Sequence, residues 1–355
     1  MVLLLLAGCT VAYVALCVCL HRWVLRTGGL VARTHSFADA AAGGAVRSLE
    51  YTAIRGDWGT ALVAHEMFQD TVYTRHGVHV PPTGAPLVID IGANIGLFSM
   101  YVLEVSPRAV VVAAEPVAQL CALARQNTSR YGGRVWVEQV GVAAAAQTGV
   151  ELLLDPRMTA GASMHESEIT SPWKAASICT QLSAVGRDCV AAGNMPAQPT
   201  LALCTLLEVP VMRWAVVALL TPALLLFAIF LLAAPSQRRR VRCDCVVFAE
   251  LLRRAASSMH DASLRHHVAA GPIALVKVDV EGAEWDVLMG IADTEWRRIE
   301  QLVVEVHDVR GRVRRVEQLL REKGFDEVHV TQEAWASHEV LRIRSVFARR
   351  SHPVA

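Results

Sequence analysis

Two apolar runs in this chain end in acidic residues, and each run has the composition of a buried strand. The first ends in Asp90-Ile91-Gly92 and the second in Asp279-Val280-Glu281-Gly282. An apolar run that stops at an acid and a glycine is typical of a parallel strand with a ligand-binding turn at its carboxyl end. Together the two runs predict a site for a nucleotide-like cofactor at one edge of a parallel sheet.

The residues after the first run fit a strand-to-helix turn that holds a nucleoside. Gly92 and Gly96 permit positive φ angles and let a cofactor approach the backbone. Glu115 ends the next apolar run, about 20 residues further on, where a carboxylate accepts hydrogen bonds from ribose hydroxyls. We expect the cofactor to be bound by Asp90, Gly92, Ala93, Asn94, Gly96 and Glu115.

Two cofactors fit this turn, a dinucleotide and S-adenosylmethionine. A dinucleotide site has a middle glycine that makes room for the pyrophosphate, and that position is Asn94 here. Asp90 would also bring a negative charge near the phosphates. S-adenosylmethionine has no phosphate, and its ammonium and sulfur are cationic, so a nearby carboxylate favours it. The pattern therefore favours S-adenosylmethionine, with an NAD-dependent oxidoreductase as the less favoured alternative.

Three residues at the ends of later runs are candidates for catalysis: Asp279, Glu281 and His307. In methyl transfer to a hydroxyl, the enzyme holds the acceptor in line and takes its proton. We expect His307 to be the base, because an unperturbed histidine pKa of about 6.5 suits proton acceptance at neutral pH. Asp279 is the alternative base, and helix capping is the alternative role for Glu281, because acids favour helix N-termini. No fixed ligand spacing is present, so no metal is predicted.

The elements that must position these residues form an alternating pattern of strands and helices. Strands are predicted at 87–91, 109–114, 135–140, 273–280, 302–307, 327–331 and 341–348. Helices are predicted at 95–105, 117–131, 283–291 and 312–323. Such alternation favours a parallel sheet with right-handed crossovers. We expect an α/β, Rossmann-like sheet of seven strands with helices on both faces and an antiparallel last pair.

The order of the motifs resembles that of a known family. Ile89–Ser99 (IDIGANIGLFS) is followed by Ala114-Glu115-Pro116, by Lys277–Glu284 (KVDVEGAE) and by Glu305-Val306-His307. In this order they resemble the FkbM-type family of S-adenosylmethionine-dependent methyltransferases. The resemblance implies a seven-stranded methyltransferase fold, S-adenosylmethionine as cofactor, and commonly transfer to an oxygen of a small-molecule or sugar-type acceptor.

The resemblance is incomplete. It covers about 60–155 and 240–350, and it leaves out both the beginning of the chain and a long insertion. Val247-Phe248-Ala249 stands where the family usually has Thr-Leu-Asp, so an acid is missing. A catalytically inactive methyltransferase-like protein that binds a membrane or a partner therefore remains an alternative.

Two apolar segments predict contact with a membrane. Val2–Leu20 is long enough to cross a hydrocarbon core of ~30 Å, and the basic residues that follow favour a cytosolic location for the rest. Ala215–Ala234 is a second candidate, but a single span there would separate the two halves of the sheet. We expect a membrane-bound protein with a cytosolic catalytic domain and an apolar helical insertion.

The predicted organisation is a transmembrane anchor at 1–25, a linker at 26–60, two halves of the methyltransferase domain at 61–158 and 241–350, and an insertion at 159–240. The net charge of +1 gives no bulk attraction for nucleic acid. The nine cysteines show no regular framework, and Cys243 and Cys245 alone are too few for a zinc site.

Overall fold

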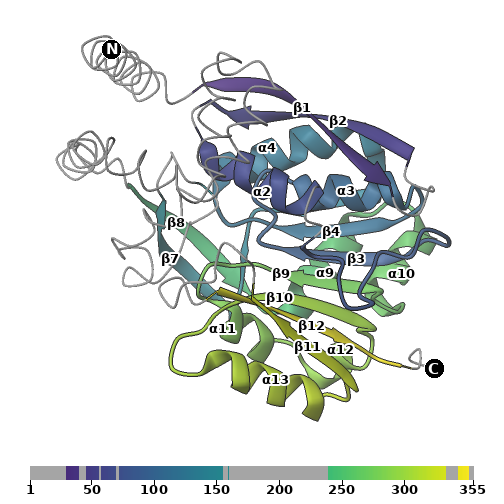
Figure 1. Ribbon diagram of the computed structural model, residues 1–355, viewed down its shortest axis with the longest axis vertical. Coiled ribbons are helices and arrows are strands. Elements are labelled where there is room, and N and C mark those ends of the chain that lie inside the picture. Colours follow the sequence, from purple (N-terminus) through teal and green to yellow (C-terminus); the bar gives the residue numbers. More distant parts are fainter. Residues whose placement is uncertain are drawn as a thin grey trace, which may run out of the picture.

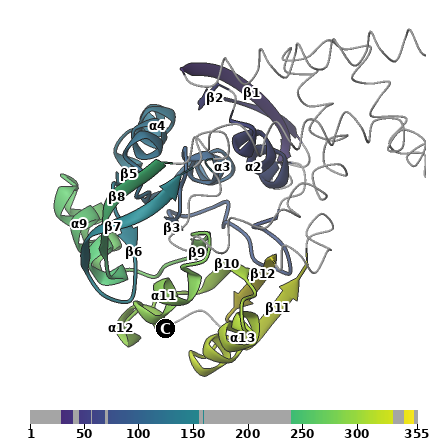
Figure 2. The ribbon, with the colours of Figure 1, turned by 90° about the vertical axis from the view of Figure 1, so that its left-hand side faces the viewer.

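A seven-stranded sheet forms the centre of the protein, as seen in a computed structural model that describes residues 29–39, 45–55, 57–68, 72–154, 159, 239–332 and 343–351. The strand order is β11-β12-β10-β9-β3-β4-β5 (Figure 1, with β5 labelled in Figure 2). The strands are β3 (Leu87–Ile91), β4 (Val110–Ala114), β5 (Val135–Glu138), β9 (Leu275–Val278), β10 (Gln301–His307), β11 (Glu327–Thr331) and β12 (Ile343–Arg349).

The direction of the strands defines where a ligand can bind. Strands β5, β4, β3, β9 and β10 are parallel, and β12 lies antiparallel between β10 and β11. The chain starts this sheet at β3, moves outward to β5, and returns to β9 on the other side of β3. The carboxyl ends of β3 and β9 therefore form the switch point where open α/β sheets bind ligands. The predicted mixed sheet is confirmed.

Helices cover both faces of the sheet, which explains why every residue of β3 and β4 is buried. Val88 and Val111 share a core with α3 (Leu97–Val105) and α4 (Ala118–Thr128). On the opposite face lie α9 (Phe248–Ser258), α10 (Ala262–Ala270), α11 (Glu284–Met289), α12 (Asp293–Trp296) and α13 (Arg312–Glu322) (Figure 1). The predicted helical layers are confirmed.

Helix α13 shows how the sequence determines one of these packed elements. Val313, Val316 and Leu320 are buried, and their spacing of three and four residues places them on one helical face. Gly324 follows the helix with a φ of +84°, a left-handed conformation that a glycine adopts without steric cost. The helix therefore ends close to the predicted position.

A two-stranded ribbon forms an outer layer where a linker was expected. Strands β1 (Leu30–Asp39) and β2 (Ala45–Ile54) are antiparallel and cover α2 (Trp58–Phe68) and its neighbours (Figure 2). Leu49 and Ala53 are fully buried in the same core as α3. The predicted linker at 26–60 is therefore wrong over these strands, because alternate apolar residues of a half-buried ribbon resemble an irregular polar segment when read in isolation.

A small second sheet lies beside the carboxyl ends of the main one. It contains β6 (Gly141–Val142), β7 (Gln147–Leu154) and β8 (Arg239–Val246). Strand β8 is parallel to β6 and antiparallel to β7. Strand β8 begins at Arg239, whereas the second half of the domain was predicted to begin at residue 241. The second half therefore begins two residues earlier than predicted. Residues 160–238, most of that insertion, lie outside the described residues.

The predicted membrane localisation needs correction. Among the described residues, no helix is both long and apolar enough to span a bilayer. Helices α2, α4, α9 and α13 have 11 residues each, or about 16 Å against a hydrocarbon core of ~30 Å. The apolar segments Val2–Leu20 and Ala215–Ala234, from which the prediction came, lie outside the described residues. The prediction is therefore not supported.

Candidate active site

The turn after β3 has the backbone shape that its glycines predict. Gly92, Asn94 and Gly96 have φ angles of +82°, +51° and +87°. The amides of Gly92 and Ala93 donate to the carbonyl of Ala114 at the end of β4, at 3.0 and 3.1 Å. These bonds hold the turn over the carboxyl ends of two neighbouring strands, where α3 then begins.

The glycines serve contacts within the protein as well as access for a ligand. A Cβ atom on Gly92 would overlap the backbone carbonyl oxygen of Asp279, and one on Gly96 would lie 3.2 Å from the Cα of Ala124. We expected room for a cofactor to be the reason for both glycines. The structure adds another reason, because the turn packs directly against the end of β9 and against the middle of α4.

Glu115 lies at the end of β4 with 5% of its surface exposed. Its carboxylate accepts hydrogen bonds from the amides of Asn94 at 2.8 Å and Val117 at 2.9 Å. Desolvation by burial raises the pKa of Glu115 to about 7, although the two amides and Lys277 act in the opposite direction. Each carboxylate oxygen has a further lone pair, so Glu115 can also accept from hydroxyl groups of a ligand.

Asp90 lies behind the pocket rather than in its lining. The residue is completely buried, accepts a hydrogen bond from the hydroxyl of Ser99 at 2.7 Å, and has a carboxylate oxygen 3.3 Å from the ammonium of Lys277. We predicted contact between Asp90 and the cofactor. The geometry instead gives Asp90 an internal role, because its carboxylate holds Lys277 and has no face open to a ligand.

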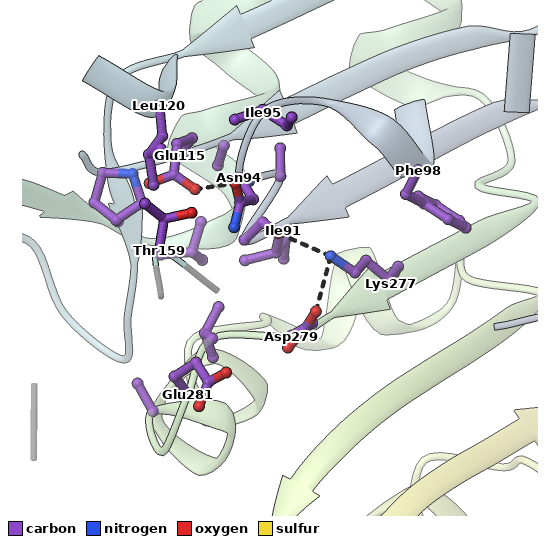
Figure 3. Close-up of a pocket in the computed structure, with 18 of the residues that line it drawn as sticks. Ile91, Asn94, Ile95, Phe98, Glu115, Leu120, Thr159, Lys277, Asp279 and Glu281 are labelled. Atoms are coloured by element: carbon purple, nitrogen blue, oxygen red, sulfur yellow. Dashed lines mark hydrogen bonds and ion pairs between the residues drawn. The ribbon is translucent and has the colours of Figure 1, made fainter. Parts of the chain in front are cut away.

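Lys277 joins the two halves of the site. Its ammonium donates to the carbonyl of Gly92 at 2.8 Å and lies 3.3 Å from a carboxylate oxygen of Asp279 (Figure 3). The rings of Tyr73 and Phe98 have their centres 5.3 and 5.9 Å away. Burial alone would lower the pKa of this lysine, but Asp90 and Asp279 raise it above its ordinary value. Lys277 is therefore a fixed cation beneath the pocket.

Asp279 brings one carboxylate oxygen into this network and leaves the other toward the pocket. Its Oδ2 atom accepts a hydrogen bond from the hydroxyl of Tyr73 at 2.9 Å and also contacts Lys277. In Figure 3, Asp279 and Glu281 lie on the side of the pocket opposite Glu115. The side chain of Asp279 is 18% exposed. It is therefore held in place by its neighbours and remains accessible to a ligand.

His307 is enclosed by carboxylates, which changes the role expected for it. Its Nε2 lies 3.2 Å from Glu281 and its Nδ1 lies 2.8 Å from Glu284. Burial lowers the pKa of His307, but the bonds to these two acids raise it well above the ordinary value. The imidazole is therefore charged at neutral pH, with both nitrogens occupied. It cannot accept a proton from a substrate, so the predicted base role does not fit.

Glu284 anchors this group from below. It is fully buried and accepts from the Gly282 amide at 2.6 Å and from Arg312 at 2.7 Å, in addition to His307. Burial acts to raise the pKa of Glu284, but His307, Gly282 and Arg312 hold it below its usual value. Glu284 therefore holds His307 in place, and His307 in turn holds the carboxylate of Glu281. Glu281 has a left-handed φ of +50° and lines the pocket.

One pocket is bordered by Gly92, Asn94, Glu115, Asp279 and Glu281, and its space, counted together with the solvent at its mouth, is about 1020 Å³. One side is formed by the turn after β3, by Glu115 and by β6 and β8. The other side is formed by Asp279 and Glu281, and α2 supplies Met67. The Oδ1 atom of Asn94 is buried without a hydrogen-bond partner, which is costly unless a ligand donates to it. The lining fits a nucleoside with a cationic, phosphate-free tail, because most of its charged side chains are carboxylates, which accept hydrogen bonds and attract a cation.

Comparison with known proteins agrees with the motifs. The sequence profile of the Methyltransferase FkbM domain matches residues 254–327. The 31-O-demethyl-FK506 methyltransferase FkbM of Streptomyces tacrolimicus is 29% identical over 287 residues, which cover 81% of this chain and 88% of that protein. This chain belongs to the FkbM-type methyltransferase family.

Two further proteins are similar to this FkbM-type methyltransferase. The AMB antimetabolite synthetase AmbE of Pseudomonas aeruginosa is 31% identical over 281 residues, which are 78% of this chain. The chain spans only 11% of the length of that synthetase. The crystal structure of a methyltransferase FkbM from Methylobacillus flagellatus aligns with 82% of this chain and 60% of its own at 11% identity. Its TM-score of 0.36 is too low to support an argument.

A cluster of acids in this FkbM-type methyltransferase satisfies the distances of a metal site. Carboxylate oxygens of Asp279, Glu281 and Glu305 lie within 4.8 Å of one another. Lys277 and His307 already place positive charge beside two of these acids. We therefore assign no metal to the cluster.

Several pocket residues of the FkbM-type domain were not predicted. Tyr73 comes before the first strand of the main sheet in the sequence. Only the folded chain brings its hydroxyl within hydrogen-bond distance of Asp279. Asp57, itself buried, accepts hydrogen bonds from the hydroxyls of Thr60 and Thr159, each at 2.6 Å, and both threonines line the pocket. No motif or spacing connects these residues, so only the three-dimensional structure reveals them.

Proposed function

We propose that this FkbM-type protein is an S-adenosylmethionine-dependent methyltransferase that methylates a hydroxyl oxygen of a small-molecule or sugar-type acceptor. The observation that carries the proposal is that Glu115, the Gly92–Asn94 turn and Asp279 line one pocket. The first two suit a nucleoside, and the third suits a proton acceptor beside it.

Several residues would hold the cofactor. Glu115 would accept hydrogen bonds from the ribose hydroxyls, and the buried Oδ1 of Asn94 would accept from a donor of the nucleoside or its tail. The carboxylates of Asp279 and Glu281 make the side of the pocket opposite Glu115 negatively charged. The same charge opposes a pyrophosphate, which supports S-adenosylmethionine over NAD. When bound, S-adenosylmethionine supplies an electrophilic methyl group on a cationic sulfur.

Asp279 is the base of the proposed reaction. Tyr73 and Lys277 both bind its Oδ2 atom, so Oδ1 is the oxygen that receives the acceptor proton. The carboxylate holds the acceptor oxygen by this hydrogen bond and takes the proton as the new bond forms, which contributes typically 10²–10⁴-fold to such reactions. The walls from α2 and α3, including Met67 and Phe98, exclude water from the reacting groups.

The name of the Streptomyces tacrolimicus relative supports transfer to oxygen, because that protein is described as a methyltransferase of 31-O-demethyl-FK506. The acceptor of the present protein is a separate question. The presence of Lys277, Asp279 and Tyr73 in one network favours an active enzyme over an inactive relative, despite the absence of the family acid near Val247.

A labelling experiment tests this function. The purified full-length chain is incubated with S-adenosylmethionine carrying a ¹³C-methyl group and with the small-molecule fraction of a cell extract, followed by mass spectrometry. The proposal predicts an enzyme-dependent labelled methyl ether and release of S-adenosylhomocysteine. Cofactor binding without any labelled product would favour the inactive relative, and NAD-dependent turnover would favour the oxidoreductase.

A further inference from the structure

Two cysteines line the pocket beside Glu115 and have no part in the proposed methyl transfer. Cys243 and Cys245 on β8 are 7% and 4% exposed, and both are free thiols. Asp244 between them is exposed, because successive residues of a strand face opposite sides. The two thiols therefore lie on the same face of β8 and are directed toward the cofactor pocket.

The strands next to β8 leave room for this pair. Gly141 pairs with Cys245 across β6 and β8, and a Cβ atom on this glycine would lie 2.7 Å from the sulfur. On the other side, the register of β7 shifts between Gln147 and Val150, the residues opposite Cys245 and Cys243. Such a bulge increases local twist and redirects side chains. The interaction between the two side chains raises the pKa of the Cys243 thiol and lowers that of the Cys245 thiol.

We propose that Cys243 and Cys245 form a dithiol that hydrogen peroxide oxidises to an intramolecular disulfide, and that this modification prevents cofactor binding. The second part rests on the proposed function, whereas the first does not. The pair is a better candidate than Cys121, which is fully buried in α4 and does not line the pocket. A matched comparison between the pair and Cys121 is therefore possible within one chain.

The chemistry is balanced with one peroxide per disulfide. The neighbouring Cys243 side chain lowers the pKa of the Cys245 thiol, whose sulfur lies beside Gly141 at the pocket, and this makes Cys245 the first nucleophile. Its thiolate attacks a peroxide oxygen, the O–O bond breaks, and the departing hydroxide takes up the proton that the thiol lost. The sulfur of Cys243 then displaces hydroxide from the Cys245 sulfenic acid, and the Cys243 proton converts that hydroxide to a second water.

The disulfide would change the pocket because β8 is extended. Residues two apart in a strand have Cα atoms roughly 6.6 Å apart, near the upper end of the disulfide range of about 4.4–6.8 Å. Closing the bond draws the backbone of β8 together next to Gly141, the partner of Cys245. Gly141 lines the pocket together with Glu115, so the shape of the pocket changes there. A disulfide strained in this way is also readily reduced. The modification would therefore be reversible.

Mass spectrometry and calorimetry test the proposal on the full-length chain. The reduced protein is treated with hydrogen peroxide, its peptides are mapped, and S-adenosylhomocysteine is titrated before and after. We expect loss of two hydrogens from the peptide that contains Cys243 and Cys245, and at least a tenfold rise in the dissociation constant that a reductant reverses. Saturating S-adenosylhomocysteine should slow the oxidation at least tenfold.

Two variants serve as controls. Cys121→Ala should retain both the disulfide and its effect on binding, and Cys243→Ala should not lose the two hydrogens. The proposal is overturned if excess peroxide leaves the two sulfurs unlinked, or if they link and the dissociation constant changes less than twofold. If the reduced protein fails to bind S-adenosylhomocysteine at all, the proposed function and the control of binding both fail. The peptide map then still decides whether the disulfide forms.

Discussion

Gly92 and Asp279 lie so close together that only a residue without a side chain fits at position 92. A Cβ atom there would overlap the carbonyl oxygen of Asp279. Lys277 strengthens this contact, because its ammonium binds the Gly92 carbonyl at 2.8 Å and the Asp279 carboxylate at 3.3 Å. The cofactor turn and the acidic strand end, one from each half of the domain, therefore form one rigid unit.

The first prediction concerns that contact. Gly92→Ala should push the turn away from β9 and lose most affinity for S-adenosylmethionine. It should also lower the free energy of unfolding by about 2–5 kcal/mol, from overpacking and from a left-handed φ of +82°. Calorimetric titration and thermal denaturation measure both effects.

Gly84→Ala is the matched control for this variant. Gly84 has a similar φ of +79°, and a Cβ atom there would meet nothing within 4 Å. It should cost only about 1–2 kcal/mol, from the left-handed conformation alone, and should leave cofactor affinity unchanged. Equal losses in both variants would mean that backbone conformation, and not the contact with Asp279, explains the glycine.

The second prediction concerns Glu115, whose pKa burial raises to about 7. Hydrogen bonds from ribose hydroxyls favour the ionised carboxylate, so affinity for S-adenosylmethionine should increase as pH rises from about 6 to 8. Binding below pH 7 should release a proton, which titration in buffers of different ionisation enthalpy detects. Glu115→Gln should remove this dependence and weaken binding by about 1.5–3 kcal/mol.

The stability of the free protein gives an independent check on Glu115. Since its folded-state pKa is above the unfolded value of about 4.5, the folded state keeps the proton longer. The free energy of unfolding of wild type relative to Glu115→Gln should therefore fall as pH rises from about 4.5 to 7. Glu250→Gln, which removes a surface carboxylate on α9, should leave the pH dependence of binding intact. A flat affinity profile in the wild type would exclude the assigned role of Glu115.

The third prediction is that His307 is a structural cation. His307→Gln should lower the free energy of unfolding by about 3–5 kcal/mol, because it breaks a buried ion pair with Glu284. The pKa of His307 is raised on folding, so its contribution is complete below about pH 6.5 and is lost as pH rises through the higher folded-state pKa. The difference from wild type should therefore shrink at alkaline pH in chemical denaturation.

His266→Gln, at an exposed position on α10, is the control and should change stability by less than about 0.5 kcal/mol. If the loss in His307→Gln instead grew with pH, His307 would be neutral in the folded protein. The base role that the sequence suggested would then be restored.

The fourth prediction separates Asp279 from the residue that supports it. Asp279→Asn should reduce turnover about 10²–10⁴-fold, since an amide cannot accept the proton. Tyr73→Phe removes one hydrogen bond to the carboxylate and should reduce turnover by about fivefold to tenfold. Release of S-adenosylhomocysteine with the labelled acceptor measures both.

Tyr131→Phe removes a hydroxyl that donates to Glu104 outside the pocket, and it should leave turnover unchanged. Full activity in Asp279→Asn would show that the proton leaves by another route, and the base assignment would be withdrawn.

The sequence predicts the central sheet well because its signals are local. Continuous apolar runs such as Leu87–Ile91 define strands buried on both faces, and a glycine or an acid marks where each ends. The ribbon β1–β2 was missed because most of its buried residues alternate with exposed or half-buried ones. Helix α9 was missed as well. It follows the insertion, so no alternation of strands and helices directly before it indicated a helix there.

The site was predictable in position but not in protonation. Glu115 and Asn94, whose spacing from Gly92 led to their prediction, line one pocket with that glycine, and their contact with a cofactor stays a prediction. The cofactor contact predicted for Asp90 and the base role predicted for His307 do not fit the structure, because burial and neighbouring charges depend on side chains that are distant in sequence. The acids around His307 decide whether it is a base or a cation, and a strand end alone does not reveal them.

Calorimetric titration of the reduced full-length chain with S-adenosylmethionine and, separately, with NAD tests the central claim most directly. The pocket formed by Glu115, Gly92 and Asp279 predicts saturable binding of S-adenosylmethionine, its loss in Gly92→Ala, and no heat from NAD. Saturable binding of NAD with none of S-adenosylmethionine would contradict the account.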